Sequence, residues 1–415
     1  MSRNLTAKYL IETSLDVEKA AQMMAGEQSS GTFVKIPGET DELKANHAAQ
    51  VIKIEIIGEC ETPTLPGAKR KNGNTIHRAI VELNWPYENI GNNLANLCAT
   101  IAGNLYELHP FSGLKLLDVE IPVEFTQKYK GPRFGIAGTR EKTGVFGRPI
   151  IGTIIKPSVG LTPEATADQV KILINAGLDF IKDDELMGDS PHSPFEKRVD
   201  LVMDVINKYA DNTGKKPMFA FNISGDMDDM LKRHDYVFSK GGTCIMLSMN
   251  WVGISAVSKV ANHTQLPLHG HRNGWGMFTR CEVLGMDFLA YQKIWRMAGV
   301  DHLHTNGIRN KFCESDESVI RSIKACLEPM HGGYHAMPVL ASGQWAGQTV
   351  DSYNAIKTVD IMYLCGGGIV AHPGGITAGV KSVIQGWEAA VQGIDLQTYA
   401  KTNKELFQAL EFFKS

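Results

Sequence analysis

The sequence predicts an α/β protein of two domains, in which a TIM (β/α)8 barrel follows a smaller α+β domain of ferredoxin-like type. Two observations predict the barrel. From about residue 148 onward, short apolar runs rich in β-branched residues alternate eight times with amphipathic stretches of helical spacing. Eight βα units over roughly 250 residues favour a closed barrel over an open doubly wound sheet. A Rossmann fold is the competing interpretation, but no GxGxxG motif follows the first strand.

The N-terminal domain is expected to span residues 1–145, with the barrel domain at 146–415. Its segments are typical of an antiparallel sheet that carries helices. Strands are expected at Ala7–Ser14, Val51–Ile57 and Thr75–Trp85, and helices near Val17–Gly26 and Asn92–Ala102. The segment Tyr129–Gly147 is rich in glycine and basic residues, and we interpret it as the linker between the domains.

The eight barrel strands are expected where the apolar runs occur. These are Ile150–Ile155, Leu178–Ile181, Met218–Ile223, Thr243–Leu247, Leu266–His271, His302–His304, Met337–Leu340 and Asp360–Leu364. Helices are expected between them, among others at Thr162–Ala176, Phe195–Tyr209, Phe288–Ala298 and Val380–Val391. Thr162 suits the N-cap of its helix, and Pro163 suits the first helical position.

Composition excludes several classes of function. Apolar residues make up 43% of the 415 residues and charged residues 21%, which is ordinary for a globular protein. A net charge of -3 gives no reason to expect nucleic-acid binding, and no apolar run is long enough to span a membrane. The N-terminus carries no apolar signal core, and the seven cysteines are scattered without a CxxC pair. We therefore expect a cytoplasmic protein with reduced thiols and neither a nucleic-acid nor a membrane partner.

The most informative segment is Lys182-Asp183-Asp184-Glu185, which ends the apolar run of the second barrel strand. Burying these charges is unfavourable unless they pair with one another or hold a metal. Side chains alternate along a strand, so Lys182 and Asp184 share a face. Two carboxylates suit Mg2+, and a lysine becomes an anionic oxygen ligand when CO2 converts it to a carbamate. A structural ion pair at the strand end is the alternative interpretation.

Polar residues follow almost every other strand as well. The ends carry Lys156-Pro157-Ser158, Asn222, His269, His271, Arg272, His302, His304, Ser342-Gly343 and Gly366-Gly367-Gly368. A single histidine at a strand end is usually structural. Seven of eight ends being polar indicates a catalytic site at the C-terminal face of the barrel.

Residue types suggest the chemistry of that site. Backbone amides at Ser342-Gly343 and at the triple glycine suit a phosphate, although the triple glycine also fits a tight turn with positive φ. Arg272 suits a second anionic group, and Lys156 suits a general base or acid. Mg2+ at Asp184 and Glu185 would polarise a carbonyl or enediolate. Together they suit proton abstraction next to the ketone of a phosphorylated, sugar-like substrate.

These residues, in this order, resemble the large subunit of RuBisCO over nearly the whole chain. The matching motifs are Thr153-Ile-Ile-Lys-Pro157 with Gly160-Leu161, Gly177–Glu185, His271-Arg272, Asp301–His304, Ala341-Ser-Gly343, and Gly366–Gly368 with His372-Pro373. The resemblance implies that Lys182 is the carbamylated lysine, with Asp184 and Glu185 as Mg2+ ligands. It implies phosphate binding or proton transfer for His271, Arg272 and His304, and it makes Lys311 the lysine of a mobile loop.

The resemblance also implies an assembly. Glu27, Gly31-Thr32 and Gly103-Asn104 resemble family positions that complete the site of a neighbouring subunit. We therefore expect at least a homodimer, or a higher homo-oligomer, in which Glu27, Thr32 and Asn104 serve the partner's site.

Several departures from the carboxylases accompany the resemblance. Ser158 replaces a second lysine, and Ile154, Phe33, Trp275 and Gln344 stand where the carboxylases have threonine, tryptophan, histidine and glycine. The tail after the barrel is short as well. This pattern is similar to RuBisCO-like proteins, which enolise other phosphorylated carbonyl compounds without fixing CO2.

The leading hypothesis is a Mg2+-dependent RuBisCO-like lyase or isomerase that enolises a phosphorylated keto-sugar or keto-acid. Lys156 would move the proton, with Lys311 or His271 assisting. Retention of Lys311 favours a carboxylate-bearing substrate and a decarboxylation of the 3-oxo-isoapionate 4-phosphate type. The alternatives are the methionine-salvage enolase acting on a diketone phosphate, methylthioribulose-phosphate isomerase, a true carboxylase, and a non-catalytic binding protein on the same scaffold.

Overall fold

The computed structural model describes residues 4–31, 36–68 and 75–413, and the chain forms two compact units. One unit contains residues 1–130 together with 274–298, and the other contains 131–273 together with 299–415. Each unit therefore consists of two separate stretches of sequence. The expected boundary between residues 145 and 146 stays a prediction.

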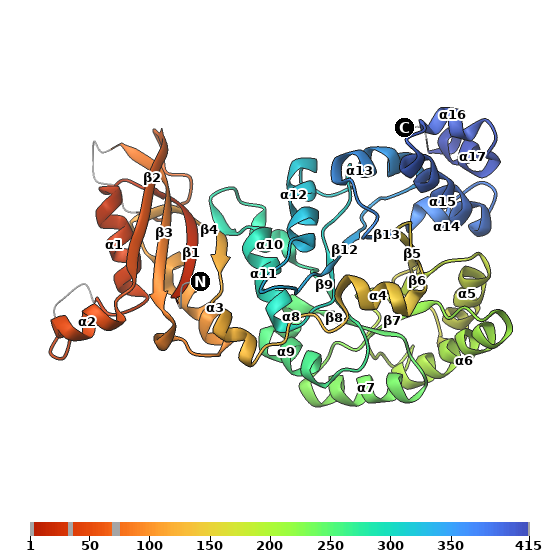
Figure 1. Ribbon diagram of the computed structural model, residues 1–415, viewed down its shortest axis with the longest axis horizontal. Helices are drawn as coiled ribbons and strands as arrows, with labels where there is room; N and C mark the ends of the chain where they lie inside the picture. Colours follow the sequence, from red (N-terminus) through yellow and green to blue (C-terminus); the bar gives the residue numbers. More distant parts are fainter. Residues whose placement is uncertain (1–3, 32–35, 69–74, 414–415) are drawn as a thin grey trace. The chain divides into compact units, whose positions relative to one another are not determined.

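The first unit is a five-stranded sheet with helices (Figure 1). Its elements are β1 (Asn4–Thr13), α1 (Val17–Glu27), α2 (Asp41–His47), β2 (Gln50–Cys60), β3 (Ile76–Pro86), α3 (Leu94–Ala102) and β4 (Phe111–Glu120). The order β4-β1-β3-β2, with all three pairings antiparallel, is that of a ferredoxin-like sheet. Alternate residues of β1 are fully buried, so this strand anchors the core of the unit.

Later residues add an unexpected edge to this sheet. The strand β10 (Leu284–Met286) pairs in parallel with β4, between the helices α10 (Trp275–Thr279) and α11 (Phe288–Ala298). The Tyr106 hydroxyl donates to the carbonyl of Gly285 at 2.7 Å, which fixes the added strand.

A buried carboxylate joins three strands of the same sheet. Glu12 is fully buried and accepts hydrogen bonds from Ser112, Thr64 and Arg78 at 2.6–2.9 Å. Burial alone raises the pKa of Glu12, but these hydrogen bonds outweigh burial and lower it from 4.5 to about 2.

The second unit is a closed barrel of eight strands, as expected (Figure 1). The strands are β5 (Ile150–Ile154), β6 (Phe180–Lys182), β7 (Met218–Asn222), β8 (Cys244–Ser248), β9 (Leu268–His271), β11 (His302–His304), β12 (Met337–Leu340) and β13 (Met362–Leu364). Every pairing around the barrel is parallel, so all strand C-termini meet at one rim.

Helices follow the barrel strands in sequence. They include α5 (Pro163–Asn175), α6 (Phe195–Thr213), α7 (Met227–Ser239), α8 (Met249–Val252), α9 (Ile254–His263), α12 (Asp316–Leu327), α13 (Thr349–Ile356), α14 (Gly367–Val370), α15 (Ile376–Gln392), α16 (Leu396–Ala400) and α17 (Lys404–Phe412). The Thr162 hydroxyl accepts from the amide of Ala165 at 3.2 Å, which confirms the expected N-cap.

The expected linker contains a helix, and this is a correction. Within Tyr129–Gly147 the chain forms α4 (Gly135–Thr143), and residues from 131 onward belong to the barrel unit. Arg140 of this helix pairs with Asp360 at 2.7 Å, and Asp301 accepts from the amides of Phe134 and Gly135. The glycine and basic residues that suggested a linker therefore begin the helix and tie it to the barrel.

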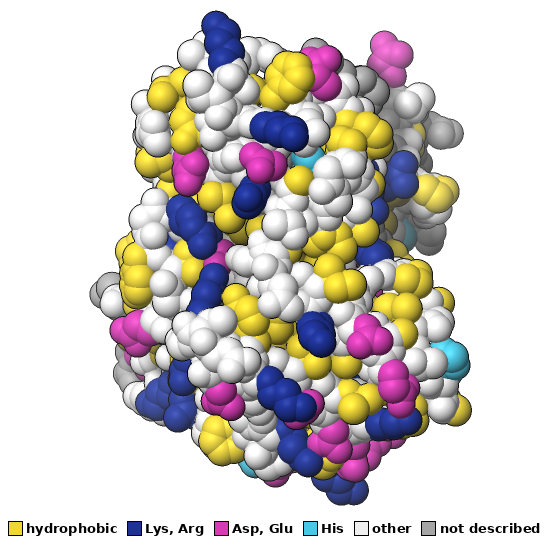
Figure 2. All heavy atoms as spheres, turned by 90° about the vertical axis from the view of Figure 1, so that its right-hand side faces the viewer, with side chains coloured by type: hydrophobic (Ala, Val, Ile, Leu, Met, Phe, Trp, Pro, Cys, Tyr) yellow, Lys and Arg dark blue, Asp and Glu magenta, His cyan; other side chains and the backbone are white. Residues whose placement is uncertain are grey.

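The surface carries mixed charge. Figure 2 shows one face on which acidic and basic side chains are interspersed with apolar ones. Among the described residues, no helix combines the length and the apolar character that crossing a membrane requires.

Candidate active site

A lysine and a carboxylate from neighbouring strands meet at the C-terminal rim of the barrel. Lys156 follows β5, and its Nζ donates to Oδ2 of Asp184 at 2.6 Å and to Oγ of Ser158 at 2.7 Å. The Lys156 side chain is 45% exposed, whereas Asp184 is 2% exposed. The ammonium therefore meets solvent while it holds a buried carboxylate in place.

Lys182 lies deeper, at the end of β6, and is 1% exposed. Its Nζ donates to the carbonyl of Asp183 at 2.8 Å and lies 3.7 Å from Oε2 of Glu185. Burial lowers the pKa of Lys182, although the neighbouring carboxylates oppose that effect. Asp184 shows the opposite balance, because burial raises its pKa while Lys156 and Lys182 bring it below its ordinary value.

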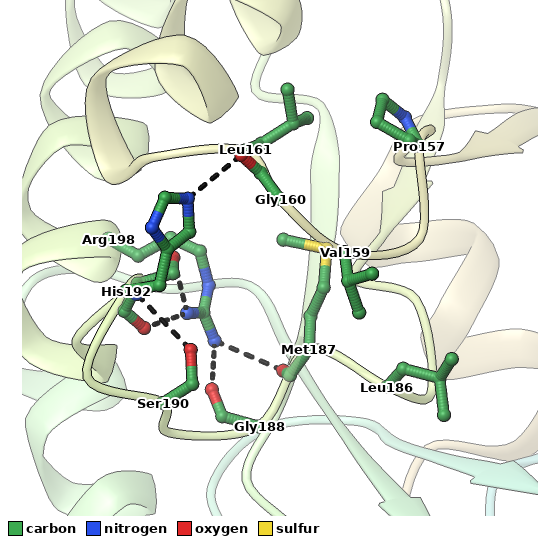
Figure 3. Close-up of a pocket in the computed structure, with 11 residues that line it drawn as sticks. Pro157, Val159, Gly160, Leu161, Leu186, Met187, Gly188, Ser190, His192 and Arg198 are labelled. Carbon is green, nitrogen blue, oxygen red and sulfur yellow. Dashed lines mark hydrogen bonds between the residues drawn. The ribbon is translucent and has the colours of Figure 1, made fainter.

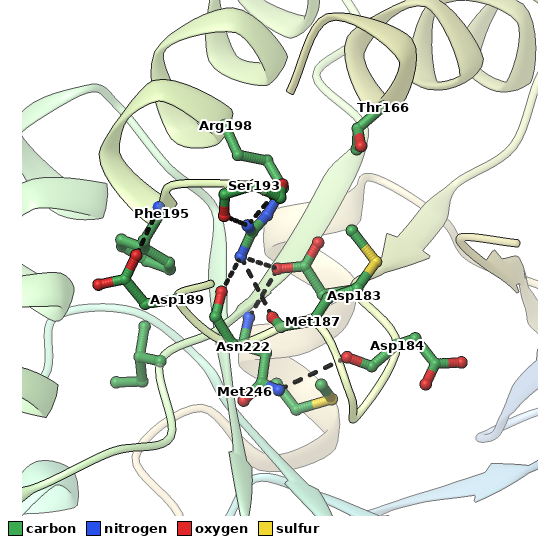
Figure 4. A network of polar contacts seen from close by, with 12 residues as sticks. Thr166, Asp183, Asp184, Met187, Asp189, Ser193, Phe195, Arg198, Asn222 and Met246 are labelled. Atoms are coloured by element: carbon green, nitrogen blue, oxygen red, sulfur yellow. Dashed lines mark hydrogen bonds and ion pairs between the residues drawn. The ribbon is translucent and has the colours of Figure 1, made fainter. Parts of the chain in front are cut away.

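Asp183 points toward Arg198 and away from Asp184, and it has a structural role (Figure 4). It is fully buried, lies 3.4 Å from Arg198 Nη2, and accepts from the amide of Asn222 at 3.0 Å. Asn222 in turn donates through Nδ2 to the carbonyl of Glu185 at 3.1 Å. Asp183 thus anchors the segment, and Asn222 holds the loop that carries Glu185.

His271, at the end of β9, reaches the same carboxylate. Its Nε2 lies 3.5 Å from Oε2 of Glu185, and its Nδ1 accepts from the amide of Asn273 at 3.2 Å. Burial lowers the pKa of His271 to about 3. His304 packs beside it, with the ring centroids 4.4 Å apart. The hydrogen-bond pattern makes Nε2 of His271 the protonated nitrogen.

Two of the expected anion-binding residues, Arg272 and Ser342, belong to one connected network. Arg272 Nη2 pairs with Oε2 of Glu314 at 2.8 Å. Asn306 Nδ2 donates to the same oxygen at 2.6 Å, and its Oδ1 accepts from Ser342 Oγ at 3.0 Å. Glu314 and Asn306 thus join the loops after β9, β11 and β12. Neither was expected at the site: Glu314 lies well inside the loop after β11, and Asn306 closely follows His302 and His304, which alone were taken from that strand end.

The loop that carries Lys311 rests on the loop after β12. The amide of Lys311 donates to the carbonyl of Ser342 at 3.2 Å, and Gly343 adopts a positive φ of 87° beside it. Gln344 is 1% exposed and donates to the carbonyl of Ile308 at 3.2 Å. A Cβ on Gly307 would lie 2.1 Å from the Gln344 side chain, so a larger residue at that position would have to displace the end of that side chain.

The triple glycine begins a short helix. Gly366 precedes α14, and a Cβ on Gly368 would lie 2.5 Å from the carbonyl oxygen of Gln344. The third glycine is therefore needed for close packing against the loop after β12. Gly366 and Gly367 have open space around their Cα atoms, which leaves their backbone approachable.

A cavity of about 380 Å3 lies beside the candidate site (Figure 3). Apolar side chains of the loops after β5 and β6 line it, among them Val159 and Leu186, with Arg198 and His192 as polar neighbours. Its lining includes Pro157 and Leu186, the chain neighbours of Lys156 and Glu185, but no predicted site residue.

The residues expected to serve a neighbouring subunit belong to the first unit. Glu27 ends α1 and Asn104 follows α3, and both are exposed. Gln28 lies between the two segments. In the orientation of its side-chain amide that satisfies both groups, the nitrogen donates to the Ala99 carbonyl at 3.3 Å and the oxygen accepts from the Asn104 backbone N–H at 3.0 Å. Thr32 and Phe33 lie outside the described residues.

A second cluster of titratable groups lies away from the rim. Asp235 Oδ1 contacts His263 Nε2 at 2.6 Å and His234 Nδ1 at 2.9 Å. The amide of Gln265 donates to Nε2 of His234 at 3.4 Å, so Nδ1 carries the proton of the neutral ring. A metal would have to displace that proton, and the cluster is therefore better described as hydrogen-bonded.

Comparison with known proteins gives a consistent result over the whole chain. Residues 135–413 match the ribulose bisphosphate carboxylase large chain, catalytic domain, and residues 2–125 match its N-terminal domain. The chain is 50% identical, over 100% of both sequences, to the 3-oxo-isoapionate-4-phosphate transcarboxylase/hydrolase of Xanthobacter autotrophicus. It is 45% identical, over 99% of this chain and 98% of the relative, to a 3-oxo-isoapionate-4-phosphate decarboxylase of Rhizobium etli.

Solved structures of rubisco-like proteins and Rubisco have the same fold as this chain. A rubisco-like protein from Burkholderia fungorum matches with a TM-score of 0.94 at 43% identity, covering 99% of this chain and 100% of that one. Octameric ribulose-1,5-bisphosphate carboxylase/oxygenase from Pyrococcus horikoshii matches with a TM-score of 0.88 at 30% identity, covering 99% and 94%. A dimeric archaeal Rubisco from Hyperthermus butylicus matches with a TM-score of 0.86 at 27% identity, covering 99% and 96%.

Proposed function

The chain belongs to the ribulose bisphosphate carboxylase large-chain family, among its non-carboxylating, RuBisCO-like members, and from this we propose its reaction. It cleaves the bond between the carboxylate and the adjacent carbon of 3-oxo-isoapionate 4-phosphate or a closely similar 3-oxo acid phosphate. The relatives at 45–50% identity that carry this substrate in their names support it over the methionine-salvage compounds. The contact between Lys156 and Asp184, next to Lys182 and Glu185, is the observation that carries the proposal.

We propose that Lys182, Asp184 and Glu185 hold Mg2+, with Lys182 as a carbamate. The donor set fits this ion, because Asp184 and Glu185 offer hard oxygen ligands, and the two lysines and the neutral imidazole beside them, Lys156, Lys182 and His271, bring no competing negative charge. Carbamate formation joins the Lys182 nitrogen to CO2 and releases one proton. When bound, the ion supplies charge stabilisation for an enolate oxygen.

The chain's own residues bind the substrate and move the proton. The loops joined by Arg272, Glu314, Asn306 and Ser342 seat the phosphate, and Lys311 neutralises the carboxylate that is lost. When the carbon–carbon bond breaks, its electron pair passes into the adjacent carbonyl and gives an enolate. Nζ of Lys156 then supplies a proton to the enolate carbon, which ends the reaction.

The assembly and the location are also proposals. The family's solved structures include dimers and octamers, and this supports a homodimer or larger assembly in which Glu27, Thr32 and Asn104 serve the partner's site. A cytoplasmic location is proposed because all seven cysteines, which lie among the described residues, are free thiols.

The test follows candidate substrates by NMR in D2O with Mg2+ and bicarbonate. The panel contains 3-oxo acid phosphates with a 13C-labelled carboxylate, diketone phosphates and keto-sugar phosphates. Wild-type protein is expected to release the label from the 3-oxo acid and to place deuterium on the adjacent carbon, while Lys156→Ala and Lys182→Ala do neither. Label that appears as CO2 identifies a decarboxylase, and label carried into a second product identifies a transcarboxylase or hydrolase. Turnover of only the diketone or keto-sugar phosphates would overturn the proposal.

A further inference from the structure

A chain of hydrogen bonds runs through the barrel interior from α4 to the rim. Thr139 Oγ lies 2.8 Å from Nε2 of His302, whose Nδ1 lies 3.3 Å from Nδ1 of His269. Nε2 of His269 then lies 2.8 Å from Nε2 of His304. Thr139, His302 and His269 are fully buried, and the Phe180 ring stacks on His269 with centroids 5.2 Å apart. The chain is therefore shielded from water until it reaches His304, which is 7% exposed.

Thr139, the first residue of this series of hydrogen bonds, determines which atom donates in every later bond. The Thr139 hydroxyl bonds to the carbonyl of Gly135, one turn earlier in α4, and a carbonyl can only accept. The single hydroxyl hydrogen is thereby used, so Thr139 Oγ accepts from His302. His302 must carry its hydrogen on Nε2, which leaves its Nδ1 as an acceptor.

The hydrogen position on His302 in turn determines the hydrogen positions on His269 and His304. His269 donates from Nδ1 to His302, so its Nε2 accepts from His304. His304 donates from Nε2, and its Nδ1 carries no hydrogen. Burial lowers the pKa of His302 to about 3 and brings those of His269 and His304 well below the ordinary value, so each ring is neutral with one hydrogen. Nδ1 of His304 makes no hydrogen bond with any described residue.

We propose that Thr139 is a positioning residue that acts through His302 and His269 to keep Nδ1 of His304 free of hydrogen, so that His304 accepts a hydrogen bond from an O–H group of the substrate. This deepens the proposed function and rests on it. The partner of His304 is then a hydroxyl or a protonated phosphate oxygen, since a phosphate dianion offers only acceptors. His304 was expected to bind phosphate, and the chain restricts that role to a phosphate that carries a proton.

Thr139→Val is expected to reverse the direction of the hydrogen bonds between Thr139 and His304. Thr139→Val keeps the shape of the side chain but offers His302 no acceptor, and a buried N–H without a partner is unfavourable. All three rings can avoid this by moving their hydrogens, so that His302 donates from Nδ1, His269 from Nε2, and His304 carries its hydrogen on Nδ1. Thr139→Ser keeps the hydroxyl and the original order.

Thr143→Val is the matched control on the same helix. The Thr143 hydroxyl is buried and donates to the carbonyls of Thr139 and Arg140, but it contacts no histidine. It therefore reports the effect of losing a helical threonine hydroxyl without any change in the order of the histidine hydrogens.

Neutron diffraction of the deuterated full-length protein tests the proposal directly. Deuterium is expected on Nε2 of His304 in wild type, Thr139→Ser and Thr143→Val, and on Nδ1 in Thr139→Val. Deuterium on Nδ1 of His304 in wild type overturns the proposal, and this readout does not depend on a variant that folds. An unchanged position in Thr139→Val overturns the role of Thr139.

Kinetics on the substrate identified above give the second readout. Converting an acceptor into a donor removes one substrate hydrogen bond, so kcat/KM of Thr139→Val is expected to fall about tenfold, with both controls within about twofold. Equal kcat/KM for all four proteins overturns the substrate contact. The affinity for inorganic phosphate then shows whether the O–H group belongs to the phosphate or to a hydroxyl of the substrate. This affinity should differ between wild type and Thr139→Val only if a protonated phosphate oxygen is the partner of His304. If wild type turns over no compound, the proposed function fails, while the neutron maps still decide the order of the chain.

Discussion

Replacing Lys182 with methionine is expected to separate the stability of the free protein from its response to Mg2+. The Lys182 amine is 1% exposed, donates to the carbonyl of Asp183 and lies 3.7 Å from Glu185. Methionine keeps most of the length of the side chain and removes the charge. Glu185 is 32% exposed and can be hydrated, and Asp184 keeps its contact with Lys156, so no carboxylate is left buried and unpaired.

The substitution is expected to leave the Tm of the free protein unchanged or higher and to abolish the rise in Tm that Mg2+ causes. Removing the buried Lys182 charge removes its desolvation cost, and neither Glu185, which stays hydrated, nor Asp184, which stays paired with Lys156, is left as an uncompensated buried charge, so the free variant should melt no lower than wild type. A ligand at 100 times its Kd stabilises the native state by about 2.7 kcal/mol, which for a unit of this size raises Tm by roughly 5–10 °C. Wild type is expected to show that rise with Mg2+ and bicarbonate, and Lys182→Met is expected to show none.

Differential scanning calorimetry with and without Mg2+ and bicarbonate measures both effects. Lys216→Met is the matched control, because burial also lowers the pKa of Lys216 but this residue precedes β7 and lies outside the candidate site. It should retain the full rise in Tm. A rise in Tm that persists in Lys182→Met would refute the carbamate role, and a large drop in the Tm of the free variant would refute the reasoning about the buried charge.

Three further predictions concern other parts of the chain. The lowered pKa of Glu12 contributes stability that is present above pH 4.5 and is lost as the pH falls toward 2. Glu12→Gln should therefore lower the free energy of unfolding of the first unit by about 3 kcal/mol at pH 7. It should also make acid unfolding, followed by circular dichroism, less dependent on pH. Asn222→Ala removes the bond that holds the Glu185 loop, and it should weaken Mg2+ binding about tenfold by calorimetry; unchanged affinity would show that Asn222 has no part in holding the ligand. The variants Glu27→Gln and Lys182→Ala should each be inactive alone. If sites are shared between subunits, unfolding and refolding the two variants together should restore about a quarter of wild-type activity, because half of the dimers are mixed and each mixed dimer has one intact site. If sites are not shared, no activity should return.

The barrel could be predicted from sequence because its strands are buried on both faces. Such strands appear as largely apolar runs, and the expected strands Met218–Ile223 and Met337–Leu340 coincide closely with β7 and β12. Closure of the barrel then brings distant strand ends to one rim, which is why Lys156 and Asp184 were placed in the same candidate site before any distance was known. Alternation along the strand predicted that Lys182 and Asp184 share a face, and Asp183 between them contacts Arg198, whereas Asp184 contacts Lys156.

Other features carry no periodic signal. The strand β10 has three partly exposed residues and forms only because β4 offers an edge. The hydrogen bond between Thr139 and His302 joins residues that are 163 positions apart. Thr139 also lies within the segment that its composition had led us to interpret as a linker. Glu314 was missed for the same reason, because its contacts with Arg272 and Asn306 arise from loop conformation rather than from spacing.

The strand β10 has a consequence for the order in which the protein can be completed during translation. The sheet of the first unit needs residues 274–298 for its outer edge, yet about 140 residues of the barrel are synthesised before them. At about 5–20 residues per second, the ribosome takes on the order of 10–30 s to supply that edge. During this interval β4 is paired with β1 on one side only, and its other edge is unpaired, the kind of surface on which nascent chains aggregate. A gene fragment that ends at residue 130 would therefore encode a permanently incomplete sheet, and a barrel fragment that begins at residue 131 would carry β10 without its partner.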